Sequence, residues 1–343
     1  MTSSAHSYVD AAPGAARRRA LGLLVAFVTG AGVSLQGKIN SVLATRLEDG
    51  LVAALISFGT GFVLLALMAV ALPRPRRGLR RIRAALAERR LRWWHLTGGF
   101  CGALLVASQG LTIGVLGVAV FTVAVVGGQI ASSLLMDRLG VGPGGRRPIS
   151  MQRLTGAVLA ICAVALAVSD RLSHPAGLVL AVLPLLAGIA AAWQQGVNGQ
   201  VGAAARDGDG GAYLESTLPA TLVNFTTGTA ALAVVAGVGV LSHGVPRPLP
   251  SQPWLYLGGT LGIAFIGSMV VLVRRIGVLL LGLGMVAGQL VTSLLLDLLA
   301  PSGEHPLTVL TVTGTVSTLL AAGIAAWPGG AGPAPRRDAR MVE

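Results

Sequence analysis

Long apolar segments recur along almost the whole chain and constrain its fold more than any other feature. The hydrocarbon core of a bilayer is about 30 Å thick, so a spanning helix needs about 20 apolar residues. Only 11% of the residues are charged and 53% are hydrophobic, whereas soluble domains carry about 25% charged residues. We therefore expect an all-α integral membrane protein. Its ten predicted transmembrane helices lie at residues 20–44, 51–73, 93–112, 116–137, 152–170, 176–199, 217–241, 253–273, 276–298 and 307–327.

The basic residues between these segments predict the topology. With a cytoplasmic N-terminus, 22 of the 26 lysines and arginines fall in cytoplasmic segments, and only Arg46, Arg171 and Arg247 fall in external loops. Such a bias is the positive-inside rule. It predicts a multi-pass protein of a bacterial cytoplasmic (inner) membrane with both termini cytoplasmic. Because the basic residues are spread over short loops, the expected partner is the lipid bilayer and not nucleic acid.

The second half of the chain repeats the first. Residues 127–140 read GGQIASSLLMDRLG and residues 287–300 read AGQLVTSLLLDLLA. Further pairs are SFGTG with NFTTG, QGKIN with QQGVN, and WWHLTGGFCG with PWLYLGGTLG. Each half contains five predicted spans, an odd number, so the second half must cross the membrane in the opposite sense. The predicted units are a disordered tail (1–19), a first repeat (20–171), an inverted second repeat (172–327) and a disordered C-terminal tail (328–343).

These repeated motifs resemble the YdcZ-type inner-membrane proteins of the drug/metabolite transporter (DMT) superfamily. Many members are similar to one five-helix half, and this chain is similar to two halves fused. The resemblance implies a DMT-like fold and a secondary transporter. The relationship to small multidrug transporters implies proton-coupled export. Those transporters carry a glutamate inside the first span, and this chain has none there.

The chain offers no recognisable catalytic or metal-binding pattern. Of its thirteen acidic residues only Asp137, Asp170 and Asp297 lie at a predicted span, each near its end, and all five histidines lie at predicted helix ends or in loops. No paired carboxylates, metal-ligand cluster or Ser-His-Asp arrangement can be read from these positions. We therefore expect no enzyme, no metal and no cofactor.

Polar side chains inside the apolar segments are the candidate substrate-binding residues. An unsatisfied amide is costly in lipid, so each needs a partner. Residues four apart share a helix face, which applies to Gln36 with Asn40 and to Gln194 with Asn198. One interpretation is that both pairs converge with Gln129, Gln289 and Trp193 on a central cavity. The alternative is hydrogen bonding and packing between neighbouring helices.

Asp137 and Asp297 are the candidate ion-coupling residues. Buried carboxylates can carry protons because burial favours their neutral form. The alternative is an anionic residue at the membrane–water interface, and Arg138 follows Asp137 directly.

Three functional hypotheses remain open at this point. The first is a secondary-active exporter of a small polar or cationic metabolite or drug. The second is a lipid-carrier flippase, and the third is a non-transporting membrane subunit. Because one chain holds both repeats, a monomer is as compatible with the sequence as a homodimer.

Overall fold

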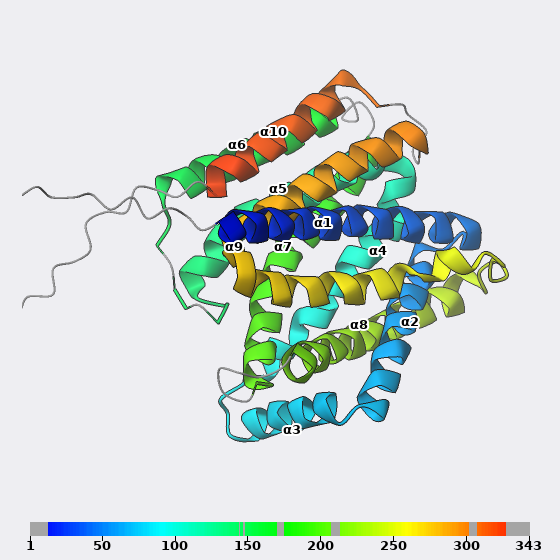
Figure 1. The fold of residues 1–343 in the computed structure, drawn as a ribbon. Helices are drawn as coiled ribbons and strands as arrows, with labels where there is room; N and C mark the ends of the chain where they lie inside the picture. Colours follow the sequence, from blue (N-terminus) through cyan, green and yellow to red (C-terminus); the bar gives the residue numbers. More distant parts are fainter. Residues whose placement is uncertain are drawn as a thin grey trace, which may run out of the picture.

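The computed structural model describes residues 13–143, 145–146, 148–169, 175–206, 213–301 and 307–326, and their regular structure is helical. The first half forms α1 (Pro13–Leu47), α2 (Gly50–Ala71), α3 (Pro73–Ala87), a 3-10 turn (Trp93–Thr97), α4 (Gly98–Leu116), α5 (Val118–Leu139) and α6 (Met151–Val168). The second half forms α7 (Pro175–Ala204), α8 (Tyr213–His243), a 3-10 turn (Pro253–Tyr256), α9 (Gly258–Leu299) and α10 (Val309–Ala326). Figure 1 shows these helices packed into one bundle, with the start of α1 and the end of α10 on the same side.

Six helical segments in the described part of the chain are each long and apolar enough to cross a membrane: Ala20–Leu47, Gly50–Ala71, Trp93–Leu116, Val118–Leu139, Leu180–Ala204 and Glu215–Ser242. Shorter apolar helices are Met151–Ala167, Gly284–Leu299 and Val309–Ile324. Large apolar side chains such as Leu67 and Val234 are 61% and 67% exposed, as expected of surfaces that face lipid. The fold is therefore an all-helical membrane fold, and the count of ten spans stays a prediction.

Helix α9 is one helical run whose two arms are antiparallel to each other. A straight helix of 42 residues would be about 63 Å long. In its first arm, Gly258 lies against Asn40 and Gly262 lies against Gln36, one turn earlier in α1. In its second arm the direction is reversed. Gly284 lies against Ala26 of α1, and further along the chain the carbonyl of Ala300 accepts a hydrogen bond from Nζ of Lys38, which also comes later in α1. Figure 1 shows the same reversal between the yellow and orange parts of the chain. The predicted loop between the eighth and ninth spans, at Arg274 and Arg275, lies within this run.

The two repeats exchange contacts through matching glycines. A Cβ atom at Gly99 of α4 would lie 2.0 Å from Thr227 Oγ1 of α8. Its counterpart Gly259 of α9 lies in the same way against Thr60 and the backbone of α2. Thus the third predicted helix of each repeat packs on the second helix of the other.

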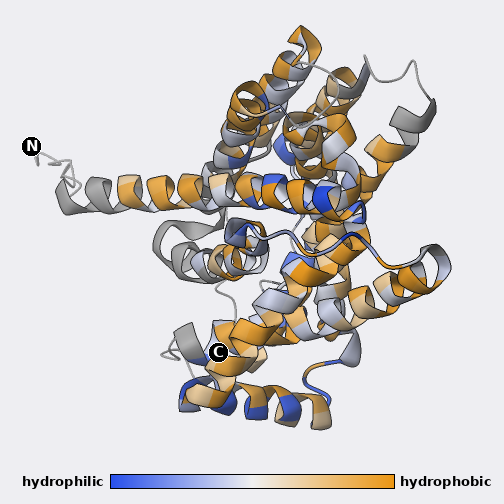
Figure 2. Ribbon diagram, turned by 90° about the vertical axis from the view of Figure 1, so that its right-hand side faces the viewer, coloured by the Kyte–Doolittle hydropathy of each residue, from blue (hydrophilic) through white to orange (hydrophobic). Residues whose placement is uncertain are grey.

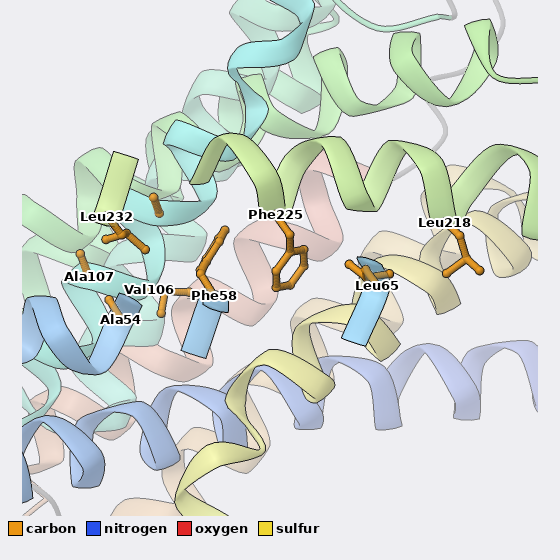
Figure 3. Close-up of a cluster of buried hydrophobic side chains, with 9 residues drawn as sticks. Ala54, Phe58, Leu65, Val106, Ala107, Leu218, Phe225 and Leu232 are labelled. Carbon is orange, nitrogen blue, oxygen red and sulfur yellow. The ribbon is translucent and has the colours of Figure 1, made fainter. Parts of the chain in front are cut away.

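Two phenylalanines meet where α2 and α8 approach each other. The ring centroids of Phe58 and Phe225 are 4.9 Å apart, with an angle of 31° between the rings. Both rings belong to a buried apolar cluster that also contains Leu65, Val106 and Leu218 (Figure 3). Since the two phenylalanines are equivalent positions of the repeats, this cluster lies at the centre of the repeat interface.

Segment 74–92, expected as a basic loop, contains the amphipathic helix α3. Ile82 and Ala85 are buried against Val201 of α7 and Ala205 just after it, while arginines occupy the opposite face. Figure 2 shows hydrophilic and hydrophobic residues alternating along this lowest helix. The prediction of a loop was wrong because the apolar face of α3 is too short to register as a span.

Three boundaries differ from the predictions or cannot be compared with them. Helix α1 begins at Pro13, inside the segment predicted as a disordered tail. Helices α4 and α5 are separated by the single residue Gly117, whose φ of 83° favours glycine. The predicted boundary between repeats at residues 171–172, and the C-terminal tail, lie outside the described residues.

Candidate functional site

A cavity of about 540 Å³ lies between the repeats and is bordered by helices of both. Such a volume is typical of small-molecule sites. Its walls are mostly apolar, with side chains such as Phe121 and Ile266. Its polar groups are dominated by carboxamides: Gln36, Gln109, Gln129, Gln194, Gln195, Asn198, Asn224 and Gln289.

Five of the seven predicted substrate-binding residues border this cavity: Gln36, Gln129, Gln194, Asn198 and Gln289. They come from α1, α5, α7 and α9. Because residues one helical turn apart share a face, the sequence pattern places Gln194 and Asn198 together on α7. The structure adds that the corresponding face of α1 borders the same space at Gln36.

The remaining two predicted residues, Asn40 and Trp193, have other neighbours. Asn40 is fully buried and donates to Gln109 Oε1 at 2.7 Å. Trp193 donates from Nε1 to Thr97 Oγ1 at 3.1 Å, and its ring centroid lies 5.5 Å from that of Trp94. Neither side chain borders the cavity, and each bonds to a neighbouring segment, which favours packing over a direct contact with cargo.

Some of the cavity carboxamides already hydrogen-bond to the protein. Gln36 Nε2 donates to the carbonyl of Gly258 at 2.7 Å. Asn224 Nδ2 donates to Asn198 Oδ1 at 3.1 Å, and Asn224 Oδ1 accepts from Gln194 Nε2 at 3.4 Å. These bonds cross-link α7 to α8 and α1 to α9, so they stabilise the cavity walls.

Gln129 and Gln289 differ from this group. Within the described part of the chain, neither side chain makes a hydrogen bond, although both border the cavity. They are equivalent positions of the two repeats and lie on α5 and α9. A carboxamide offers both donors and an acceptor, so this pair presents free hydrogen-bonding groups to a molecule in the cavity.

Gln109 and Asn224 border the cavity but were not singled out from the sequence. Gln109 lies in the third predicted span. Its counterpart in the second repeat is Met269, so the repeated sequence pattern does not mark Gln109. Asn224 corresponds to Ser57, so the repeat does not preserve its carboxamide. The cost of an amide in lipid would have marked both residues, because each lies within an apolar segment.

Next to the cavity-lining residue Val118, at the start of α5, lies the carboxylate of Asp297. This carboxylate accepts hydrogen bonds from the backbone N–H groups of Val118 at 2.9 Å and Ala119 at 2.6 Å. These are the first N–H groups of α5, which have no partner within the helix. Lys38 interacts electrostatically with the same carboxylate. We refer to this arrangement of Asp297, Val118, Ala119 and Lys38 as the Asp297 cap.

The opposite end of the cavity extends along α7. Its lining runs from Ala191 to Arg206, a distance of about 22 Å along a helix axis. Pro143, just after α5, lies at the same end. The positive-inside rule predicts that both Arg206 and the segment after α5 are cytoplasmic.

Asp137 has a different environment from its counterpart Asp297. It forms a salt bridge with Arg153, and its side chain is 34% exposed. Neither aspartate borders the cavity. Among the described residues, moreover, no three histidine, cysteine or acidic residues are grouped so that they could hold a metal ion.

Comparison with known proteins identifies one family. The family described as "Putative inner membrane exporter, YdcZ" matches residues 21–166 and again residues 179–325, so its pattern covers both halves of the chain. One solved crystal structure is similar to this chain at 18% sequence identity, with a TM-score of 0.48. The similarity covers 90% of this chain and 96% of the other chain. No curated protein matches the chain.

Proposed function

Since the chain belongs to the YdcZ family of inner membrane exporters, we propose that it is a secondary-active transporter that exports a small polar or cationic metabolite or drug by alternating access. One observation carries this proposal. The cavity of about 540 Å³ is lined by residues of both repeats, and its lining reaches Arg206 after α7. Transporters built from inverted repeats bind cargo at such an interface and expose it to one side at a time.

The two ends of the cavity support an inward-facing state. The Asp297 cap joins α5 to α9 at the external end. There, too, a Cβ atom at Gly110 of α4 would lie 2.8 Å from the carbonyl oxygen of Gly50, so α2 and α4 pack closely. At the cytoplasmic end the lining continues to Arg206. An exporter loads its cargo in this state.

Ion pairs support the proposed topology of ten spans as two inverted repeats. Arg247 pairs with Glu48 at 2.8 Å, and the topology places both on the external side. Arg81 of α3 pairs with Glu215 of α8 at 3.4 Å, and both belong to the cytoplasmic side. The antiparallel arms of α9 supply the eighth and ninth spans. Both termini are then cytoplasmic.

Proton coupling through Asp137 or Asp297 stays a prediction. Their contacts give each a structural role, one as a helix cap and one as a salt-bridge partner. The oligomeric state, monomer or homodimer, is likewise a prediction. One chain supplies both walls of the cavity, so a monomer contains a complete site.

Reconstitution in liposomes tests the proposal. A thermal-shift screen of the purified protein first identifies soluble binders, because any ligand of the folded state raises its stability. Accumulation of such a binder in proteoliposomes under an imposed ion gradient is the expected result. Scrambling of a labelled lipid carrier without solute accumulation would replace the exporter with a flippase. Absence of both activities would favour a non-transporting subunit.

A further inference from the structure

The charge of the cavity lining restricts what it can bind. The described part of the chain contains the acidic residues Glu48, Asp49, Glu88, Asp137, Glu215 and Asp297, and none of them borders the cavity. Of the other seven acidic residues of the sequence, the one at position 170 ends a predicted span, and those at positions 10, 207, 209, 304, 338 and 343 fall in the tails or in predicted loops. Among the described residues, therefore, no carboxylate borders the cavity to neutralise a cation there.

The one ionisable side chain among the described lining residues is Arg206, at the cytoplasmic end. Its positive charge repels cations that enter from that side. Deeper in the cavity the lining offers neutral amides and hydroxyls, so an anion has no counter-charge there either. An uncompensated charge within the membrane costs far more free energy than one neutral hydrogen bond returns.

The free polar groups define the rest of the cargo. Gln129 and Gln289 each present a donor and an acceptor from opposite repeats. The surfaces between them are apolar and include Phe121, Val125 and Met285. A molecule that fits both kinds of surface has an apolar body and carries hydrogen-bond donors and acceptors without net charge.

We infer that the cargo is an uncharged, hydrogen-bonding molecule with an apolar body, held by Gln129 and Gln289, and that cations are excluded. This inference rests on the proposed transport function and narrows its cargo from polar or cationic molecules to uncharged ones. It also separates this cavity from a site that binds cationic drugs through an intramembrane carboxylate.

Matched probe sets test the inference by thermal shift on the purified full-length protein. Each set combines an aromatic or aliphatic carboxamide, the carboxylate of the same skeleton and its quaternary ammonium analogue; benzamide, benzoate and phenyltrimethylammonium form one set. Stabilisation is expected from the uncharged members. Gln129→Leu and Gln289→Leu should each weaken that binding by about tenfold. Gln152→Leu in α6, a glutamine that does not border the cavity, is the matched control and should bind normally.

A charge-changing variant gives the second arm of the test. Gln129→Glu adds a carboxylate at the cavity wall and should raise the affinity for the quaternary ammonium members by at least about tenfold, since an opposite charge is then close to the cation. If the wild-type protein binds the quaternary ammonium members and Gln129→Leu weakens that binding, the inference of an uncharged cargo is wrong. The proposed transport function would remain. Absence of binding by every set would overturn both the inference and the cavity as a cargo site.

Discussion

In the proposed topology, removal of the carboxylate at residue 297 should open the external end of the bundle, next to the cavity lining at Val118. In the Asp297 cap, one side chain of α9 satisfies two N–H groups at the start of α5. Capping side chains stabilise helices by about 0.5–2 kcal/mol, and a negative charge at a helix N-terminus adds about 0.3–1 kcal/mol. Asp297→Ala should thus destabilise the closed external end by about 1–3 kcal/mol, which shifts the equilibrium by about 5- to 150-fold.

Accessibility of the start of α5 measures this shift. Ala119 is fully buried beneath the cap, so Ala119→Cys reports its opening when Cys101 and Cys162 have been replaced by alanine. In intact cells, a membrane-impermeant maleimide should label this cysteine several-fold to about a hundredfold faster with Asp297→Ala than without it. The range follows from the equilibrium shift, because labelling requires the open state.

Two variants separate release of the cap from general damage. Asp297→Asn retains an acceptor oxygen, and asparagine caps helices about as well as aspartate, so it should restore most of the protection. Asp137→Ala removes the equivalent carboxylate of the first repeat. That carboxylate pairs with Arg153 and does not cap the N-terminus of α5, so Ala119→Cys should stay protected. Unchanged labelling in a folded Asp297→Ala protein would refute the role of the cap.

Three further outcomes are expected. Gly99→Val should lower the thermal stability of the detergent-solubilised protein by several degrees, because its side chain would meet α8 within 2.0 Å; Gly59→Ala, which has open space around it, should change the unfolding midpoint little. Asn40→Leu should cost about 1–3 kcal/mol of stability, since it leaves a buried amide in α4 unpaired, yet binders should retain their affinity; a loss of affinity without a loss of stability would return this residue to the binding site. A cysteine at Ser242 should react with impermeant reagents in intact cells and one at Ala87 should not, and the reverse pattern would invert the topology.

The sequence by itself determined the membrane class and the internal repeat. Both depend on short-range patterns. The length of an apolar segment follows from the thickness of the bilayer, and a duplication leaves matching residues such as Gln129 and Gln289 at a nearly constant offset. The sequence also identified most of the carboxamides around the cavity, because an amide is costly in lipid wherever the chain folds.

Only the tertiary structure assigned partners to these groups. Asn40 meets Gln109, 69 residues away, and Asp297 meets Ala119, 178 residues away. The sequence pattern treated Asn40 like Asn198 and Asp137 like Asp297, but the structure gives the members of each pair different environments. The physical reason is that the spacing of residues along a helix determines only which face of that helix they share, and this spacing is the same in both repeats. Which helix then packs on that face, and at which end the two repeats meet, depends on contacts between distant parts of the chain.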